Sequence, residues 1–312
     1  MEKNELNKNA RGGTELMQER LHSSLPQDLL DKFQIIPSRV RDLDPNKKKI
    51  LWLHDLPQDP ESAHLTDGTS RARFSRIVCV SNWQMQMYNL ISGVPYSECT
   101  VIKNAIEPID IQEKTYDGTV RLIYHTTPHR GLEILIPVFE ELCKVHDNLH
   151  LDVYSSFKIY GWEQRDEQYK RLFDRCRENP NITYHGSVSN DEVREALKKS
   201  HIYAYPCIWP ETSCLSVIEA MSAKNMVVCP NFAVLPETCA NFAMMYPFHE
   251  NVNAHGVQFA HTLNNAINTV KFDYELAFPY IDFQKQYFDY FYGWDYRKKE
   301  WIDLLTSLDQ SE

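Results

Sequence analysis

Short apolar runs alternate with stretches of helical periodicity along most of the chain. In the N-terminal third the apolar runs are residues 33–36, 50–53, 77–80 and 100–102, and the third run leads into a helix that ends near Ile91. Short apolar runs bounded by polar residues are typical of buried strands. Because strands alternate with helices, we expect a parallel sheet covered by helices.

The same alternation starts again at Val120 and continues to the end of the chain. The expected strands are residues 120–124, 149–154, 182–185, 202–205 and 227–229. The first expected helix follows residue 132 and ends near Val145, and the others cover residues 163–178, 190–199, 216–223, 259–270 and 288–308. The last helix is crowded with aromatic residues that could form a stripe in the core, namely Tyr290, Tyr292, Trp294, Tyr296 and Trp301. The pattern predicts a second parallel α/β domain.

A segment rich in proline, glycine and charged residues, 107–119, separates the two alternating patterns. We therefore expect an N-terminal domain over residues 1–110, a C-terminal domain over residues 117–285 and a terminal helix over residues 286–312. The expected fold class is α/β, with doubly wound, Rossmann-like domains.

One stretch, Cys207–Met221, holds the strongest candidate chemistry. It places two carboxylates, Glu211 and Glu219, eight residues apart, and residues 212–214 form the turn before a helix that starts near Ser216. Backbone amides at the start of a helix, aided by the helix dipole, bind phosphate without a side chain. A carboxylate one turn further on could accept hydrogen bonds from two neighbouring hydroxyls, as on a ribose.

Composition narrows the class of protein. The chain of 312 residues is 43% hydrophobic and 12% aromatic, as expected of a folded globular protein, and its net charge of −10 argues against a nucleic-acid-binding surface. No apolar run approaches the roughly 20 residues of a transmembrane helix, and the polar N-terminus does not resemble a signal peptide. The eight cysteines include no Cys-x-x-Cys pair. We therefore expect reduced thiols, no transmembrane segment and a cytoplasmic location.

Five elements in this order resemble the group 1 glycosyltransferases, family four of the GT-B fold. They are Arg11-Gly12-Gly13 before a helix, Val80-Ser81-Asn82, Val101-Ile102-Lys103-Asn104, Arg130-Gly131, and Trp209-Pro210-Glu211 followed by Glu219. The chain departs from the family where Thr212-Ser213-Cys214-Leu215 replaces Gly-Phe-Gly-Leu and where Ala105 replaces a glycine. The resemblance implies two Rossmann-like domains that face a cleft. Compared with that family, we expect the first domain of this chain to be shortened and to lack its usual first strand.

The same resemblance implies a nucleotide-sugar donor and assigns roles to single residues. Arg130 would neutralise the diphosphate leaving group, Glu211 would orient the donor sugar and stabilise charge, and His54 would face that sugar. Glu219 would bind the ribose hydroxyls. The other residues expected to contact the donor lie in the glycine pair, in loops after strands and in the turn before the helix: Gly12, Gly13, Thr126, Thr127, Tyr184, Val188, Thr212, Ser213, Cys214 and Leu215.

Several of these residues also have an ordinary structural interpretation. His54 could be a strand-end histidine bonded to backbone, the glycine pair could be a flexible leader, and Thr126 and Thr127 could bond their own turn. Neither a metal nor a cofactor is expected. His125 and His129 are separated by Pro128, which breaks a helix, and Asp42-Leu43-Asp44 is interpreted as a solvated turn.

The sequence thus predicts a retaining, metal-independent glycosyltransferase that moves a hexose-type sugar from a UDP- or GDP-linked donor. The acceptor, whether a saccharide, a lipid-linked molecule or a protein, is not identified by the sequence. Two other functions stay open. A nucleotide-sugar 2-epimerase of the same fold would need no acceptor, and a non-catalytic nucleotide-sugar-binding protein would bind the donor without turnover.

Overall fold

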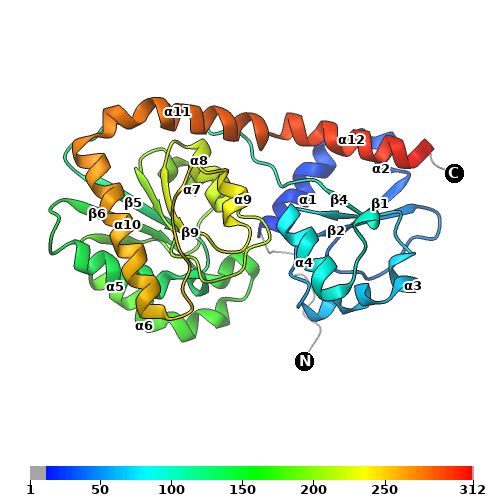
Figure 1. Cartoon of the computed structure of the whole chain (residues 1–312), viewed down its shortest axis with the longest axis horizontal. Helices are drawn as coiled ribbons and strands as arrows, with labels where there is room; N and C mark the ends of the chain where they lie inside the picture. Colours follow the sequence, from blue (N-terminus) through cyan, green and yellow to red (C-terminus); the bar gives the residue numbers. More distant parts are fainter. Residues whose placement is uncertain (1–11, 311–312) are drawn as a thin grey trace. The chain divides into compact units, whose positions relative to one another are not determined.

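The computed structural model of the protein describes residues 12–310, which divide into two compact units. The small unit comprises Gly13–Glu107, Glu211–Leu215 and residues 290–310, and the large unit comprises Gly12, Pro108–Pro210 and Ser216–Asp289. Each unit contains one parallel sheet (Figure 1). The domain limits expected from the sequence stay predictions. Residues 1–11, in which the sequence shows no strand pattern, and residues 311–312 lie outside the described part of the chain. The absence of a first strand therefore stays a prediction.

The small unit is built on a four-stranded sheet in the order β1-β2-β3-β4. Its strands are β1 (Phe33–Pro37), β2 (Lys48–Leu53), β3 (Arg76–Cys79) and β4 (Cys99–Val101), and its helical segments are α1 (Gly13–Ser24), α2 (Gln27–Leu30), η1 (Pro60–Thr66), α3 (Gly68–Arg71), α4 (Asn82–Ser92), η2 (Tyr96–Glu98) and α12 (Trp294–Gln310). Ile50 and Trp52 of β2 join an apolar cluster with α1, α2 and α12, and Leu51 and Leu53 join a second cluster with α4. This alternation explains the continuous apolar run of β2, since both of its faces are buried.

The large unit is built on a six-stranded sheet in the order β10-β9-β8-β5-β6-β7. Its strands are β5 (Val120–His125), β6 (Leu149–Tyr154), β7 (Ile182–Tyr184), β8 (Ile202–Ala204), β9 (Met226–Pro230) and β10 (Met244–Tyr246). Its helical segments are η3 (Pro128–Arg130), α5 (Leu132–Leu142), η4 (Phe157–Tyr160), η5 (Glu163–Tyr169), α6 (Lys170–Glu178), α7 (Asn190–Leu197), α8 (Leu215–Ser222), α9 (Leu235–Cys239), α10 (Val252–Phe272) and α11 (Tyr274–Phe291).

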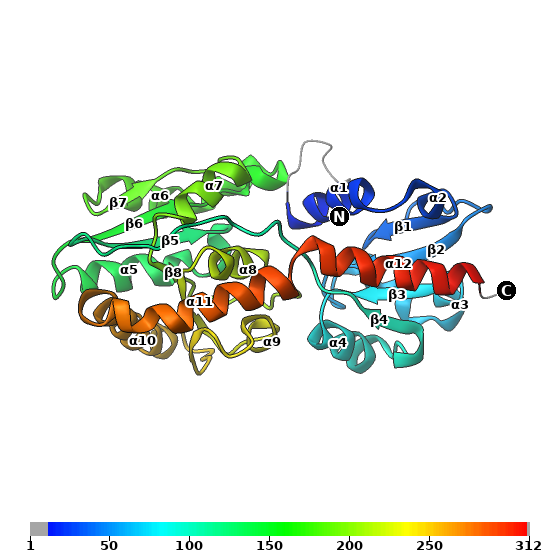
Figure 2. The ribbon, with the colours of Figure 1, turned by 90° about the horizontal axis from the view of Figure 1, so that it is seen from above.

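Helices cover both faces of the large sheet. The chain runs from β5 outward to β6 and β7 and then returns to β8 and β9, so right-handed crossovers place α5 and α6 on one face and α7 and α8 on the other (Figure 1). α11 runs beside the end of α8, where the side-chain amide of Gln284 donates to the carbonyls of Met221 and Asn225 at 3.1 and 3.0 Å (Figure 2). The doubly wound α/β architecture predicted from the sequence is present in this unit. Among residues 12–310, the structure contains no helix with the length and apolar character needed to cross a bilayer.

Several elements differ from those expected. β10 and α9 were not expected, and the helix expected over residues 163–178 is split into η5 and α6. The helix expected over residues 288–308 is interrupted after Phe291, because its first residues end α11, which begins at Tyr274, and the rest belongs to α12. The last break is explained by Ile106, whose amide donates to the carbonyl of Tyr292 at 2.8 Å and which forms a β-bridge with Gly293. The expected aromatic stripe is also only partly right. Trp301, Tyr292 and Trp294 are buried, but Tyr290 is 73% exposed.

Candidate functional site

The carboxyl ends of β5 and β8 lie side by side where the strand order of the large sheet reverses. In parallel α/β sheets, ligands bind at this switch point. The loops that follow the two strands are in close contact, because a Cβ atom at Gly131 would lie 2.1 Å from the carbonyl oxygen of Pro206. Gly131 also has a φ of 121°, which other residues rarely adopt. The approach of the two loops therefore requires glycine.

Arg130 lies at this switch point, in η3 directly after β5. Its Nη1 donates to the hydroxyl of Thr127 and, at 3.4 Å, to the hydroxyl of Tyr160. Thr127 is buried, and its carbonyl accepts from the hydroxyl of Tyr124 at 2.9 Å. Thr126 is half-buried in the same loop. A guanidinium oriented in this way can hold phosphate oxygens bidentately.

Tyr160 is a residue that sequence reasoning missed. It is 30 positions from Arg130 in the chain, and the two residues meet only because β5 pairs with β6, which η4 follows. The one local signal was the polar segment that begins at Ser155, directly after an expected strand.

Two histidines of the β5 loop are neutral and contact different neighbours. The ring of His125 lies 4.6 Å from that of Tyr203, and the ring of His129 stacks on that of Phe157 at 5.2 Å. Burial lowers the pKa of each histidine to about 3, and the nearby guanidinium of Arg130 adds to this effect at His129. In the part of the chain that the structure describes, no three His, Cys, Asp or Glu side chains are grouped to hold a metal ion.

Glu219 is buried in α8, and its carboxylate is paired with α7. It accepts from the side-chain amide of Asn190 at 3.2 and 3.3 Å and from the guanidinium of Arg194 at 3.2 Å. A carboxylate that is only 4% exposed needs such partners, because burial without them is costly. Sequence reasoning missed Arg194, although Asn190 and Arg194 are four apart and therefore lie on one face of a helix.

Tyr184 and Val188 flank the loop between β7 and α7. The hydroxyl of Tyr184 donates to the carbonyl of Ser155 at 2.8 Å, and its ring lies 4.8 Å from that of Phe173, with the guanidinium of Arg177 over it at 4.6 Å. Phe173 and Arg177 belong to α6, so the ring of Tyr184 packs on that helix. Val188 is half-buried. Contact between this loop and a nucleobase stays a prediction.

The turn Glu211–Leu215 belongs to the small unit, where Thr212 anchors it to two strands. The hydroxyl of Thr212 donates to the carbonyl of His54, which follows β2, at 2.7 Å. Its own carbonyl accepts from the hydroxyl of Ser81, which follows β3, also at 2.7 Å. The turn therefore lies at the carboxyl edge of the small sheet.

The start of α1 also lies against this turn. A Cβ atom at Gly13 would be 3.1 Å from Cδ1 of Leu215, which is a tight contact. Cys214 is buried and Ser213 is half-buried, and Gly12 belongs to the large unit. Within the small unit, Gly13 is therefore the member of the predicted glycine pair that lies next to the turn.

His54 is a neutral, half-buried histidine directly after β2. Its ring lies 4.4 Å from that of Trp52, its backbone amide donates to the hydroxyl of Ser38 at 2.8 Å, and burial lowers its pKa to about 3. The Nε2 atom has no hydrogen-bond partner among the described residues. A buried nitrogen without a partner is costly, so this atom is suited to a ligand hydroxyl. Glu211, the first residue of the turn, is 9% exposed.

The predicted residues thus form two groups. Thr126, Thr127, Arg130 and Glu219 belong to the switch-point region of the large sheet and to the helix after it, whereas Gly13, His54 and the turn 211–215 gather at the carboxyl edge of the small sheet.

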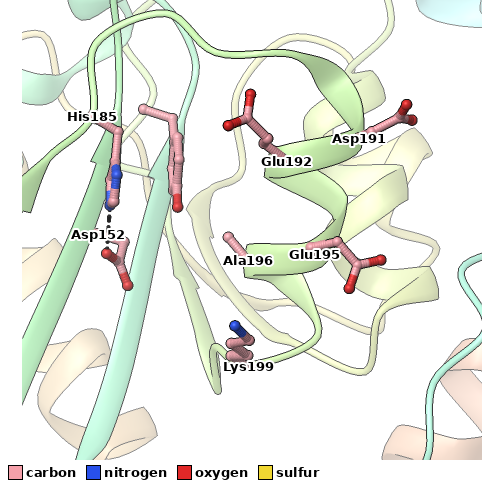
Figure 3. A pocket seen from close by; sticks show the side chains of 8 residues that line it. Asp152, His185, Asp191, Glu192, Glu195, Ala196 and Lys199 are labelled. Atoms are coloured by element: carbon pink, nitrogen blue, oxygen red, sulfur yellow. Dashed lines mark hydrogen bonds and ion pairs between the residues drawn. The ribbon is translucent and has the colours of Figure 1, made fainter.

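A separate hollow of about 460 Å³ lies between the β6–β7 edge of the large sheet and α7. Figure 3 shows Asp152 and His185 on the sheet side, Glu192 on α7 and Lys199 in the turn after that helix. The imidazole of His185 hydrogen-bonds the carboxylate of Asp152 at 2.7 Å and stacks on the ring of Tyr154. The lining of this hollow includes none of the residues predicted to bind the donor.

Comparison with solved structures identifies the class of fold. A glycosyltransferase from Rickettsia africae ESF-5 has a TM-score of 0.72 at 15% identity, covering 100% of this chain and 85% of that chain. Anabaena HepE in complex with UDP-glucose has a TM-score of 0.64 at 14% identity, covering 84% of this chain and 72% of that chain. The chain thus has the α/β fold of GT-B glycosyltransferases, as predicted.

The family follows from the sequence match. The model of glycosyl transferases group 1 matches residues 112–268, half of the chain, and the chain belongs to this family. Among curated proteins, it is 22% identical over 173 residues to a phosphatidylinositol N-acetylglucosaminyltransferase subunit of Arabidopsis thaliana. It is 25% identical over 169 residues to the phosphatidylinositol N-acetylglucosaminyltransferase gpi3 subunit of Schizosaccharomyces pombe. These matches cover 54% and 52% of this chain but only 37% and 35% of the relatives, so the chain spans about a third of their length.

Proposed function

We propose that this protein is a retaining glycosyltransferase that moves a hexose-type sugar from a UDP- or GDP-linked donor to a saccharide, lipid-linked or protein acceptor. We propose further that it needs no metal ion and works in the cytoplasm. Membership of the group 1 family supports sugar transfer. A UDP-linked donor is the first to test, because HepE, which has a similar fold, was solved in complex with UDP-glucose.

The observation that carries the proposal is the position of Arg130 at the switch point of the large sheet. Transfer from a nucleoside diphosphate sugar leaves negative charge on the departing diphosphate, and oriented positive charge stabilises that transition state. The hydroxyls of Thr127 and Tyr160 orient the guanidinium before a ligand arrives. Because the two histidines of this loop are neutral, we assign the positive charge to Arg130.

We assign the other donor contacts to α8 and its start. The amides of Ser213, Cys214 and Leu215 would bind phosphate oxygens at the start of the helix. Glu219 would accept from the ribose hydroxyls while Asn190 and Arg194 hold its carboxylate in place. This arrangement would fix the nucleoside relative to the diphosphate.

We assign the donor sugar to Glu211 and His54. Glu211 would accept from sugar hydroxyls and stabilise developing charge without forming a covalent bond, which is consistent with retention by front-face attack. His54 is neutral, so its Nε2 would form a hydrogen bond with a sugar hydroxyl and would contribute no positive charge.

The test has two stages. Thermal unfolding in the presence of UDP, GDP and their hexose conjugates identifies the nucleotide, since a ligand that binds the folded protein raises its stability. Release of nucleoside diphosphate from the selected donor is then measured for the wild type and for Arg130→Ala, Arg130→Lys and Arg175→Ala. Arg175 is the matched control, because it pairs with Glu140 between α6 and α5.

We expect Arg130→Ala to lower turnover by about 100-fold, Arg130→Lys to lower it less, and Arg175→Ala to leave it unchanged. An unchanged rate in Arg130→Ala would refute the role of Arg130. Conversion of the donor to an epimer without acceptor, or donor binding without any turnover in the presence of varied acceptors, would refute sugar transfer.

A further inference from the structure

An exposed indole ring lies in the loop after β8. Trp209 is 41% exposed, and it lies two residues before Glu211 and three after Pro206, whose carbonyl meets Gly131. Large aromatic side chains are normally buried, and an exposed one beside a ligand site is often a contact for the ligand. The proposed function gives this ring no role.

The ring is held in one orientation by its neighbours. It packs edge-on against the ring of His129, with centroids 4.9 Å apart and planes at 84°, and His129 in turn stacks on Phe157. The thiol of Cys207 donates to the carbonyl of Trp209 at 3.1 Å. The loops after β5, β6 and β8 thus contribute one ring each to a short stack. Such a stack presents the indole without the entropy cost of ordering it on binding.

The sheet order tells which part of a donor this ring would meet. The order β8-β5-β6-β7 places the loop of Arg130 after β5, next to the loop of Trp209 after β8. The loop assigned to the nucleobase follows β7, three strands from β8, or about 14 Å at the usual strand spacing. If the diphosphate is bound at β5 and the base lies toward β7, the remaining part of the donor, the sugar, extends toward β8.

We propose that Trp209 is a specificity-determining residue that stacks on the apolar face of the donor's pyranose ring. This inference rests on the proposed function, because it takes the diphosphate to lie at Arg130. The C–H groups on one face of a hexopyranose form an apolar surface of the same size as an indole, and covering that surface removes it from water. His129 is a positioning residue in this arrangement.

The test compares sugar nucleotides with free nucleotides. Titration calorimetry gives the affinities of UDP, UDP-glucose, GDP and GDP-mannose for the wild type, Trp209→Ala and Trp209→Phe. We expect Trp209→Ala to weaken binding of the sugar nucleotide by about ten-fold, as when an aromatic stacking partner is truncated. Binding of the free nucleotide should change by less than about two-fold, a difference within 0.5 kcal/mol. Trp209→Phe should restore most of the lost affinity, which also shows that the loop tolerates substitution.

The control is Phe283→Ala, which removes an aromatic ring that is 60% exposed on α11 and should change neither affinity. An equal loss for the free nucleotide and the sugar nucleotide would place the indole at the base or the phosphates and overturn the inference. Unchanged affinities for both would also overturn it. Failure of the wild type to bind any of the four ligands would instead refute the proposed function, and the inference with it.

Discussion

In the large unit, charged side chains gather at the carboxyl edge of the sheet and each has polar partners. Arg130 contacts Thr127 and Tyr160, and Glu219 contacts Asn190 and Arg194. In the small unit, neutral contacts hold the turn 211–215 to the corresponding edge. The hydroxyl of Thr212 donates to the carbonyl of His54, and the carbonyl of Thr212 accepts from the hydroxyl of Ser81. His54 is neutral because desolvation of its ring lowers its pKa.

This difference separates two ways of holding the residues that we propose to bind the donor. In the large unit those residues are charged and have polar partners, and in the small unit hydrogen bonds between neutral groups hold the turn that carries them. Substitutions in the large unit should therefore change nucleotide affinity or the stability of ion pairs. Substitutions in the small unit should produce smaller changes in the free energy of unfolding.

Gly131→Ala should produce the largest effect. The new Cβ would lie 2.1 Å from the carbonyl oxygen of Pro206, and the φ of 121° is unfavourable for alanine. Because the obstacle is backbone, the loops after β5 and β8 must separate, and we expect a loss of about 3 kcal/mol or more in the free energy of unfolding. Denaturant titration measures this loss.

Gly186→Ala is the matched control for Gly131→Ala. Gly186 also has a positive φ, of 68°, but a Cβ there would meet only the side chain of Tyr184 at an ordinary 3.9 Å. Gly186→Ala should therefore lower the free energy of unfolding by about 1 kcal/mol, which is the cost of backbone strain alone. Equal losses in the two variants would contradict the close contact between the two loops.

Glu219→Ala should produce the second largest effect, because it leaves Arg194 without its buried partner. Breaking a fully buried pair costs about 3–5 kcal/mol, and the 15% exposure of the Arg194 side chain lowers the expected loss to about 2 kcal/mol. The control is Glu195→Ala on α7, the helix of Arg194. It removes the partner of Lys198 in an exposed ion pair and should lower the free energy of unfolding by less than about 0.5 kcal/mol.

A double-mutant cycle with Arg194→Met separates the pair from any ribose contact of Glu219. If Arg194→Met alone leaves nucleotide affinity intact while Glu219→Ala lowers it, the carboxylate binds the nucleotide directly. A coupling energy near zero would show that the ion pair adds nothing to stability.

The pH dependence of stability probes His54 in the small unit. Its folded pKa of about 3 lies below the ordinary histidine value of 6.5, so the unfolded chain takes up the proton first as the pH falls. Its contribution to stability is therefore present above pH 6.5 and is lost as the pH drops toward 3, by about 1 kcal/mol between pH 7 and 5.5. His54→Asn should reduce the acid-induced loss by that amount in denaturant titrations. His22→Asn, which replaces an exposed histidine on α1, should not, and an identical reduction in both would contradict the burial argument.

The strands could be predicted from the sequence because burial leaves a local pattern. β2 is apolar at successive positions since both faces pack in clusters. β5, β8 and β9 of the large sheet are likewise buried at successive positions, whereas β6 alternates buried and half-buried residues. β10 was missed because Met244 and Met245 are only half-buried at the edge of the sheet. The break between α11 and α12 was missed because it depends on Ile106, far away in the chain.

The candidate site could be predicted only in part, for the same reason. Glycine at position 131, and arginine before it, are local features of a loop after a strand, so the sequence alone could indicate them as candidates. The partners of those residues come from other loops and helices, as Tyr160 does for Arg130 and Arg194 does for Glu219. No spacing along the chain encodes such pairs, because strand order decides which loops meet.

Thr212→Val should produce the smallest effect and gives the sharpest test of the small unit. Valine keeps the shape of threonine but removes the 2.7 Å hydrogen bond to the carbonyl of His54, while the bond from Ser81 to the backbone of residue 212 is retained. We expect a loss of about 1 kcal/mol in the free energy of unfolding, the usual net value of one such bond. Thr262→Val, which removes an exposed bond to the carbonyl of Gln258 within α10, is the control and should cost less. If Thr212→Val costs no more free energy of unfolding than Thr262→Val, the bond to His54 does not hold the turn to the small sheet, and the contrast between the two units would no longer stand.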